Sequence, residues 1–408
     1  MEDITEEQIK RMLYEINSNF LMISYVVKPL EEENGLIAQH FSLRIFYKLE
    51  RKLKELQLFL KTLNKNSPTV YNMSVRMLVF EKEQLFYMRL LPNFEKKGID
   101  ISYAPRGYLC ENQAVIMEDL SIQGFKLSSK DKFSDLEHCQ FCLATLAKFH
   151  ISSILYEVCV TNSSGKPYNL QEEHPEQLID VIYYGADEYL AKYVEQSLKG
   201  LIGLAEIQFG DTIDLNKLRD QFNSETSTKS TDMPEMRCTI LHGDLWSNNF
   251  LHKYDDNGKH IETKLIDFQL IKYGPPALDV LNFIFMNTTK SFRDKHSTYL
   301  LTFYFQKFEE FLLNRGLDVA DILPKKNFLE SCENLKRLAK IQAMVDLSLV
   351  CVPDEFMFET LIDDEKCKDF LLLNRKHYLE DIYNNYSEFR EILYEHLLEL
   401  KEMFDICC

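Results

Sequence analysis

The sequence predicts an α+β fold with a small, strand-rich N-terminal lobe (residues 1–118) and a larger helical C-terminal lobe (residues 119–408). Short apolar runs typical of strands occur between residues 41 and 117, whereas most later apolar residues recur at the three- and four-residue spacing of helices. A length of 408 residues with 45% hydrophobic content gives two or three structural units enough apolar surface to bury.

The N-terminal lobe is expected to contain strands around one internal helix. Residues 5–8 (Thr-Glu-Glu-Gln) have the pattern of a capping box, and apolar residues follow at helical spacing, so a first helix is predicted there. Predicted strands cover the apolar runs 41–47, 56–61 and 114–117. Between the last two runs, residues 75–91 have helical apolar spacing and are predicted to form one helix.

Helices are predicted for most of the C-terminal lobe. Ser134-Asp135-Leu136-Glu137 is a second capping-box pattern, and a long apolar stretch follows it. Two polar stretches, residues 161–173 and 221–235, carry too little apolar surface to offset the entropy of ordering and are predicted to be surface loops. The Leu-rich tail over residues 377–408 is predicted to be helical.

The composition argues against several classes of protein. Lys and Arg total 47 against 64 Asp and Glu, and the resulting net charge of −17 disfavours binding to nucleic acid. The sequence shows no export signal and no apolar run near the roughly 18 residues of a membrane span, so a cytoplasmic protein with reduced thiols and no membrane span is expected. Cys139 and Cys142 lack a second pair at metal-ligand spacing and are expected to be buried helix residues.

The most informative motif is Thr239-Ile240-Leu241-His242-Gly243-Asp244, which is followed by Asn249. Phosphoryl transfer needs a carboxylate that orients the attacking hydroxyl and accepts its proton, together with a nearby amide oxygen that holds Mg²⁺. The loop between Asp244 and Asn249 is long enough to place both groups around one γ-phosphate. Asp244 is therefore predicted to be a catalytic residue, and Asn249 a metal ligand.

A second carboxylate follows in Lys264-Leu265-Ile266-Asp267-Phe268, where an apolar strand ends in Asp-Phe. Asp267 is predicted to bind a metal ion that bridges the phosphates. Each motif alone has an ordinary explanation, since Asp after Gly is common in turns and Asp-Phe at a strand end is common by chance. Both motifs in this order favour a phosphotransfer site.

Two segments together resemble the motifs of the ecdysteroid kinase-like proteins of insects, relatives of choline and aminoglycoside kinases: His242-Gly243-Asp244-Leu245-Trp246-Ser247-Asn248-Asn249 and Ile266-Asp267-Phe268-Gln269. The resemblance covers residues 30–300 and includes segments 80–87, 117–120 and 146–150 in that family's order. It implies the two-lobed protein-kinase-like fold, ATP and Mg²⁺ as cofactors, and transfer of the γ-phosphate to a small-molecule hydroxyl. In characterised members of the family that hydroxyl belongs to an ecdysteroid, so a steroid is the expected substrate.

The resemblance also implies roles for residues of the N-terminal lobe. Lys61, at the end of a predicted strand, is implied to pair with the ATP phosphates, with Lys65 as the alternative. Glu83 is implied to be the helix partner of this lysine, with Glu81 as the alternative, because the family's aromatic pattern fits around Glu83.

The connection between the lobes is implied to be Glu118-Asp119-Leu120, where backbone N–H and C=O groups, such as those of Glu118 and Leu120, are expected to bind the adenine edge. Asp279 is expected to cap a helix or to tie down the catalytic loop rather than to touch the substrate. His242 is expected to be a hydrogen-bonded strut of that loop.

One feature departs from the family's pattern. Gly35 is the only glycine among the first 97 residues, so a glycine-rich phosphate loop is absent, although residues 35–42 are expected to form a strand–turn–strand over the phosphates through backbone donors. Two alternatives to a steroid kinase stay open. One is a kinase for an amine alcohol such as choline or an aminoglycoside, and the other is a pseudokinase that binds a hydrophobic ligand without turnover.

Overall fold

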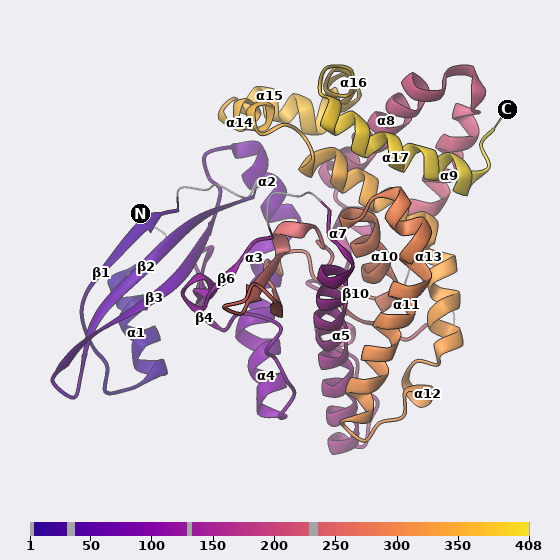
Figure 1. Cartoon of the computed structure of the whole chain (residues 1–408). Coiled ribbons are helices and arrows are strands. Elements are labelled where there is room, and N and C mark those ends of the chain that lie inside the picture. Colours follow the sequence, from indigo (N-terminus) through magenta and orange to yellow (C-terminus); the bar gives the residue numbers. More distant parts are fainter. Residues whose placement is uncertain (1–3, 31–36, 129–132, 228–235, 408) are drawn as a thin grey trace.

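The computed structural model describes residues 4–30, 37–128, 133–227 and 236–407, which fold into two lobes (Figure 1). The N-terminal lobe is built on a five-stranded antiparallel sheet with the strand order β1-β2-β3-β5-β4. Its strands are β1 (Leu21–Pro29), β2 (Ala38–Leu49), β3 (Lys52–Leu63), β4 (Gly107–Glu111) and β5 (Ala114–Glu118).

The three predicted strands lie within β2, β3 and β5, so these predictions are confirmed. No prediction covered β1 and β4. Strand β1 lies at the edge of the sheet and all its residues are exposed or half-buried, so its sequence lacks the alternation of buried and exposed residues that marks a strand.

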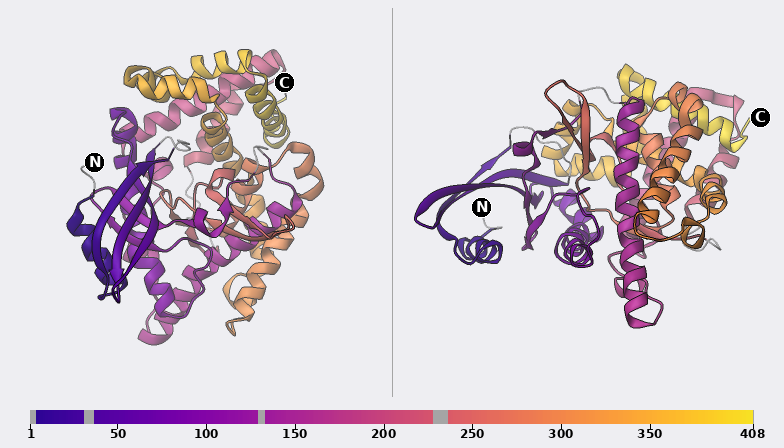
Figure 2. Two further views of the ribbon diagram at one scale, coloured as in Figure 1. Left: turned by 60° about the vertical axis from the view of Figure 1, so that its left-hand side comes forward. Right: turned by 60° about the horizontal axis from the view of Figure 1, so that its bottom comes forward.

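Helix α1 (Glu6–Ile16) lies against one face of this sheet and forms a small core with it (Figure 2). The backbone N–H of Gln8 donates to Thr5 Oγ1 at 3.2 Å, and that of Thr5 donates to Gln8 Oε1 at 2.8 Å. The predicted capping box is therefore confirmed. Ile9 and Leu13 of α1 are fully buried in a cluster that includes Leu43 of β2.

The prediction of one helix over residues 75–91 is wrong. Four segments occupy this region: α2 (Pro68–Arg76), α3 (Val79–Leu85), the π-helical turn η1 (Phe86–Leu90) and α4 (Leu91–Lys96). Leu78 has a φ of 58°, in the left-handed region, and this residue separates α2 from α3. The spacing of apolar residues could not predict this break, because it is helical on both sides of Leu78.

The C-terminal lobe is built around α5 (Leu136–Ser164), a long core helix. Its N-cap is Asp135, which accepts a hydrogen bond from the backbone N–H of His138 at 2.9 Å, so the predicted cap at Ser134 is wrong by one residue. Both Cys139 and Cys142 are buried in it, as predicted. Among the described residues, α5 alone is long and apolar enough to cross a membrane, and 67% of that apolar stretch is buried inside the fold.

Further helices complete the C-terminal lobe. The longer ones are α8 (Glu188–Phe209), α9 (Leu215–Ser227), α10 (Pro276–Asn287), α11 (Lys290–Leu313), α13 (Lys325–Val350), α16 (Arg375–Asn385) and α17 (Ser387–Phe404). The shorter ones are α6 (Leu170–Glu173), α7 (Val181–Tyr184), α12 (Val319–Ile322), α14 (Asp354–Ile362) and α15 (Asp364–Lys368). The predicted helical tail corresponds to α16 and α17 and is confirmed.

The two predicted surface loops of this lobe are shorter than expected. Within residues 161–173, α5 continues to Ser164 and α6 begins at Leu170. Within residues 221–235, α9 continues to Ser227, and the remainder lies outside the described residues. In α9 the buried side chains of Leu218 and Phe222 anchor an otherwise polar helix, which explains why composition alone missed it.

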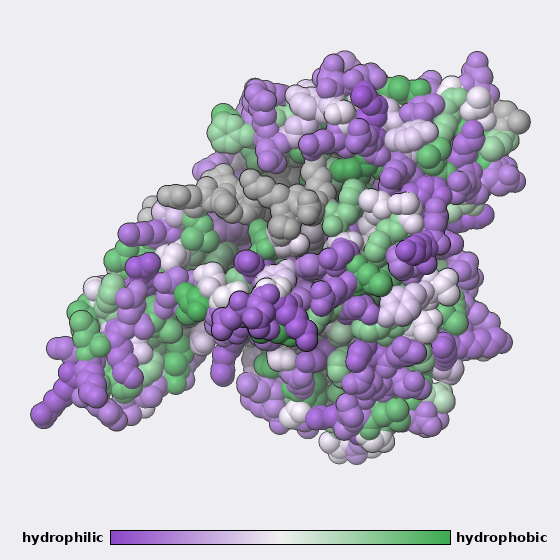
Figure 3. Space-filling view, in the orientation of Figure 1, coloured by the Kyte–Doolittle hydropathy of each residue, from purple (hydrophilic) through white to green (hydrophobic). Residues whose placement is uncertain are grey.

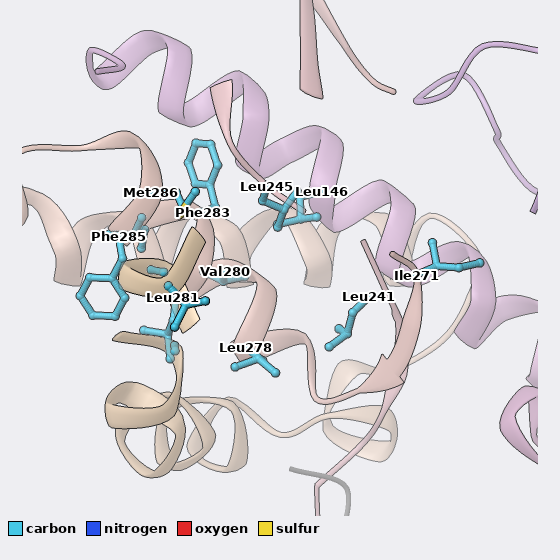
Figure 4. Packing of buried hydrophobic residues seen from close by; sticks show 14 of the residues in the cluster. Leu146, Leu241, Leu245, Ile271, Leu278, Val280, Leu281, Phe283, Phe285 and Met286 are labelled. Atoms are coloured by element: carbon cyan, nitrogen blue, oxygen red, sulfur yellow. The ribbon is translucent and has the colours of Figure 1, made fainter. Parts of the chain in front are cut away.

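Two small sheets carry the predicted catalytic segments. One pairs β7 (Thr239–Leu241) with β10 (Lys272–Gly274), and the other has the order β6-β8-β9, with β6 at Phe125–Lys126, β8 at Phe250–Tyr254 and β9 at His260–Leu265. Leu241 and Leu245 belong to the apolar cluster that includes Leu278 and Val280 of α10 (Figure 4). The β7–β8 loop therefore rests on a packed core.

The coloured part of the face in Figure 3 is mostly hydrophilic, with hydrophobic residues scattered in small groups. This pattern agrees with a chain in which 27% of the residues are charged. Scattered apolar side chains are normal on a protein surface.

Candidate active site

A cavity of about 820 Å³ lies between the lobes, with β2 and β3 on one side and the β7–β8 loop and the end of β9 on the other. Its lining includes six of the predicted site residues: Lys61, Glu83, Glu118, Leu120, Asn249 and Asp267. Asp244 adjoins it, because the side-chain amide of Asn249 donates to the Asp244 backbone carbonyl at 2.8 Å. The structure thus brings together residues from four separate parts of the sequence.

Lys61 lies on β3 and is 4% exposed, and its ammonium contacts two carboxylates. Lys61 Nζ is 3.1 Å from Glu83 Oε2 on α3 and 2.6 Å from Asp267 Oδ1. Burial opposes the charged form of the lysine, but Asp267 and Glu83 raise its pKa above the ordinary value. Burial also raises the pKa of Glu83 to about 7, against the opposing effect of Lys61.

The alternatives for this pair have different surroundings. Lys65 and Glu81 are exposed, whereas Lys61 and Glu83 are buried and face each other. The geometry therefore selects Lys61 and Glu83 as the pair in the cavity. Glu83 Oε1 is buried and has no hydrogen-bond partner among the described residues, so this carboxylate keeps a free acceptor.

Asp279 of α10 fixes the start of the β7–β8 loop. Its Oδ2 accepts from the His242 backbone N–H at 2.6 Å and its Oδ1 from that of Gly243 at 3.2 Å, while His150 Nε2 lies 3.1 Å from Oδ2. His242 Nε2 is 2.9 Å from the carbonyl oxygen of Ile266. Asp279 and His242 thus have the structural roles predicted for them.

Gly243 allows this loop to pass close to the neighbouring segment. Its φ is +78°, and a Cβ there would lie 2.5 Å from the backbone oxygen of Leu270, so any other residue would be strained and would collide.

Asp244 is partly buried at the turn that follows Gly243. Burial and then Asp267 raise its pKa to about 7, against hydrogen bonds from Asn249 and Gln269. A carboxylate with a pKa near the working pH is well matched to accept a proton from a hydroxyl. Since Asn249 uses its amide nitrogen on Asp244, its side-chain oxygen is the atom suited to a metal ion.

Asp267 has a φ of 65°, in the left-handed region, and its side chain is directed at Lys61. The next residue, Phe268, stacks on Phe86 of η1 with ring centroids 3.7 Å apart and lies 4.9 Å from the His242 ring. One aromatic side chain therefore connects the helical segment of the N-terminal lobe to the β7–β8 loop.

Comparison with known proteins places this arrangement in a family. A model described as the ecdysteroid kinase-like family matches residues 36–316, well over half of the chain. The chain belongs to the ecdysteroid kinase-like family. The predicted family is confirmed, and the structure has the predicted two-lobed α+β fold.

The matches of this ecdysteroid kinase-like protein to individual proteins are either short or low in sequence identity. The 4-hydroxytryptamine kinase of Psilocybe cyanescens is 43% identical over 47 residues, and the match spans 11% of this chain and 13% of that enzyme. The ADP-bound aminoglycoside phosphotransferase APH(2'')-Ib is 14% identical over 98% of this chain and 99% of its own, with a TM-score of 0.39. Choline kinase LicA from Streptococcus pneumoniae is 13% identical over 93% and 99%, with a TM-score of 0.33.

The connection between the lobes of this ecdysteroid kinase-like protein runs through Glu118 and Asp119. The Glu118 backbone N–H donates to the carbonyl of Arg106 at 2.8 Å, so this N–H is already used within the protein, and Glu118 lines the cavity. Asp119 accepts from the Ser121 backbone N–H at 3.0 Å and from Gln57 Nε2 at 2.7 Å. Asp119 is therefore a structural cap that links the connection to β3.

The structure of this family member describes only part of the segment predicted to cover the phosphates, residues 37–42. Gly35 lies outside the described residues. His40, Ser42 and Arg44 alternate along β2 and all line the cavity, and Ser42 Oγ is buried without a hydrogen-bond partner among the described residues. Period-two spacing along β2 was the signal that these three side chains share a face.

Sequence reasoning assigned no role to Gln269 and did not single out Asp346. Gln269 Oε1 accepts from Lys61 Nζ at 3.3 Å, and its place two residues after Asp267 was a usable signal. Asp346 of α13 makes no hydrogen bond or ion pair within the described residues, and burial followed by Asp244 raises its pKa to about 8. Burial and then Asp346 raise the pKa of Tyr183.

Proposed function

We propose that this protein is an ATP- and Mg²⁺-dependent kinase that transfers the γ-phosphate to a hydroxyl of a small molecule. The observation that carries the proposal is the contact of Lys61 with both Glu83 and Asp267, at 3.1 and 2.6 Å, in the cavity beside Asp244. A buried lysine held between two carboxylates is a preorganised positive charge, which suits the phosphates of a nucleotide.

The cavity fits a nucleotide in size and in the chemistry of its walls. Its volume of about 820 Å³ is within the usual range of small-molecule sites. Met117 and Leu120 provide apolar contact for a base, and the carbonyl of Glu118 provides a hydrogen-bond acceptor. The unpartnered hydroxyl of Ser42, on the β2 face that holds His40, is a donor directed at the same cavity and suits a phosphate oxygen.

The oxygen ligands for magnesium would be Asp267 and Asn249. The described residues contain no group of three or more His, Cys, Asp or Glu side chains around one metal position. That observation fits Mg²⁺, which proteins usually hold through one or two side chains together with substrate phosphates and water. When bound, the ion would neutralise negative charge on the phosphates.

Asp244 would orient the acceptor hydroxyl and take up its proton. The hydroxyl oxygen forms a bond to the γ-phosphorus while the bond from that phosphorus to the bridging oxygen breaks, and ADP leaves with the electron pair. Lys61 neutralises charge on the phosphates, and Glu83 holds Lys61 in place. Asp279 and His242 keep the Asp244 backbone fixed, so catalysis is chiefly positioning and electrostatics.

The acceptor we propose first is a steroid hydroxyl of the ecdysteroid type, on the strength of family membership. A second candidate is an amino alcohol, because Asp346 of α13 makes no hydrogen bond or ion pair within the described residues, and a cation bound there would favour its charged form. The relative named as a 4-hydroxytryptamine kinase supports this second candidate over a short match.

A panel assay tests both candidates. Purified protein is incubated with Mg-ATP and ecdysteroids, choline, hydroxytryptamines and polyhydroxylated xenobiotics, and phosphorylated product is detected by mass. A steroid phosphate that is lost in Asp244→Asn supports the first candidate, and a phosphorylated amine supports the second. No product from any acceptor, together with no thermal shift by Mg-ATP, would overturn the kinase proposal in favour of a non-catalytic binding protein.

Asp346→Asn separates the two acceptor classes. For a cationic acceptor, loss of the carboxylate is expected to raise KM about tenfold or more, since a charge-assisted contact contributes about 1.5–3 kcal/mol. KM for Mg-ATP is expected to stay the same, because Asp346 lies in the helical lobe on α13 and is not among the residues that line the cavity. An unchanged KM for an amine acceptor would remove Asp346 from the acceptor site.

A further inference from the structure

We infer that Lys82 is a positioning residue that fastens helix α3, and with it Glu83, to the segment following Asp267. Lys82 is 2% exposed, and its ammonium nitrogen donates to two backbone carbonyls of the C-terminal lobe. The distances are 2.5 Å to Ile271 O and 3.1 Å to Ile179 O. This inference rests on the proposed function, because it assigns Lys82 a part in arranging that same site.

The surroundings of Lys82 are unusual for a buried lysine. No carboxylate among the described residues lies within ion-pair distance of it, and Asp180, which acts on its pKa, is paired with Lys272 at 2.7 Å. Burial lowers the pKa of Lys82 to about 7. Burying an amine costs free energy unless its hydrogens are bonded, and the two carbonyls match the two N–H groups that even the neutral form carries.

The contacts of Lys82 complete a closed ring through the proposed site. Lys82 precedes Glu83 in α3, Glu83 contacts Lys61, and Lys61 contacts Asp267. Four residues after Asp267 the chain reaches Ile271, whose carbonyl accepts from Lys82. Displacement of α3 by an ångström or two would therefore break either the Lys82 contacts or the Glu83 contact.

Helix α3 depends on such anchoring more than a longer helix would. It has 7 residues, starts after the left-handed Leu78 without a side-chain cap, and continues into the π-helical turn η1. A helix of this length has little stability of its own and is held by tertiary contacts. The Phe86–Phe268 stack supplies an apolar contact to the same segment, and Lys82 supplies the polar one.

The other acceptor is itself tied to the site. Ile179 lies between Leu178, whose carbonyl accepts from the Tyr273 backbone N–H at 2.8 Å, and Asp180, which pairs with Lys272. Lys82 thus holds α3 to two chain segments that are joined to each other beside β10.

The test compares Lys82→Met, which keeps the length of the side chain but removes its donors, with Lys264→Met as a matched control. Lys264 is also buried, at 9% exposed, and donates to the Ser102 carbonyl at 2.8 Å, but it does not contact α3. Lys82→Met is expected to lower kcat on the order of 10²-fold and to weaken Mg-ATP binding about tenfold, whereas Lys264→Met changes neither by more than about twofold.

A double variant shows whether Lys82 acts through Glu83. If it does, Lys82→Met/Glu83→Gln has about the same turnover and Mg-ATP affinity as Glu83→Gln alone. Effects that multiply, or a Lys82→Met protein with a lowered Tm but unchanged Mg-ATP affinity and kcat, would overturn the inference. If Lys82→Met does not fold, Lys82→Gln replaces it, with the same expected direction and the same overturning result.

The readouts also separate this inference from the proposed function. Mg-ATP affinity and hydrogen exchange of residues 79–85 need no acceptor. Wild-type protein that binds Mg-ATP but phosphorylates nothing would count against the proposed function, while faster exchange over residues 79–85 and weaker Mg-ATP binding in Lys82→Met would still support the anchor. Unchanged exchange and binding would overturn the anchor even in an active kinase.

Discussion

The molecule contains two buried clusters of charge that differ in what surrounds them. In the cavity, Lys61, Glu83 and Asp267 come from both lobes; Glu83 Oε1 has no partner among the described residues, and the Asp267 side chain is 24% exposed. In the C-terminal lobe, Arg293 of α11 and Lys340 of α13 both contact Glu399 of α17. Glu399 accepts from Arg293 at 2.9 Å and 2.6 Å, one contact to each carboxylate oxygen.

The two clusters differ in whether their charged groups are fully paired within the protein. In the cavity, Glu83 keeps an acceptor oxygen without a partner among the described residues, and part of the Asp267 side chain is exposed. Both groups are therefore suited to contact a ligand. In the second cluster the carboxylate of Glu399 is saturated by helices of a single lobe, with His396 Nδ1 at 2.7 Å from Lys340 Nζ. The cavity cluster is therefore expected to control activity, and the helical cluster stability.

The largest effect is expected from Asp244→Asn. Loss of the carboxylate removes the acceptor for the hydroxyl proton, and kcat is expected to fall on the order of 10²–10⁴-fold. Mg-ATP affinity and Tm should change little, because the amide has nearly the same shape. Steady-state kinetics and a thermal melt check this, and a variant that keeps wild-type kcat would remove Asp244 from catalysis.

Glu399→Gln is expected to act on the other cluster. It leaves Arg293 and Lys340 buried without a carboxylate, and breaking a buried pair in this way costs about 3–5 kcal/mol. Urea unfolding measures this loss, and Mg-ATP affinity of the folded fraction should be unchanged. Glu195→Gln is the matched control, because Glu195 forms an exposed pair with Lys199 that contributes about 0.3–0.5 kcal/mol. Equal losses for the two variants would contradict the comparison.

The smallest effect concerns pH. Burial, followed by Lys340 and Arg293, lowers the pKa of His396 well below its ordinary value, so the unfolded chain binds a proton below about pH 6.5 that the folded chain does not. Stability is therefore lost as pH falls from about 6.5 towards 5, at up to about 1.4 kcal/mol per pH unit from this residue. His396→Gln should reduce this slope in urea unfolding, and an identical slope would show that His396 does not contribute.

Much of the candidate site could be predicted from short sequence motifs. His242-Gly243-Asp244, Asn249 and Asp267 lie within one stretch of chain, so roles for them could be predicted from their spacing. The sequence distinguishes Lys61 from Lys65, and Glu83 from Glu81, less clearly, because the two candidates of each pair lie close together in the chain. Burial of one member of each pair in the folded chain distinguishes them.

The sequence by itself predicted the α+β fold class, the first capping box and the two motifs around Asp244 and Asp267, because these depend on neighbours a few residues apart. Tertiary structure alone decided the break at Leu78, the raised pKa of Asp346 and the contacts of Lys82. The Lys82 nitrogen meets Ile271 across 189 positions of sequence. No local pattern encodes which carbonyl a buried amine will find, since that choice follows from how the lobes pack.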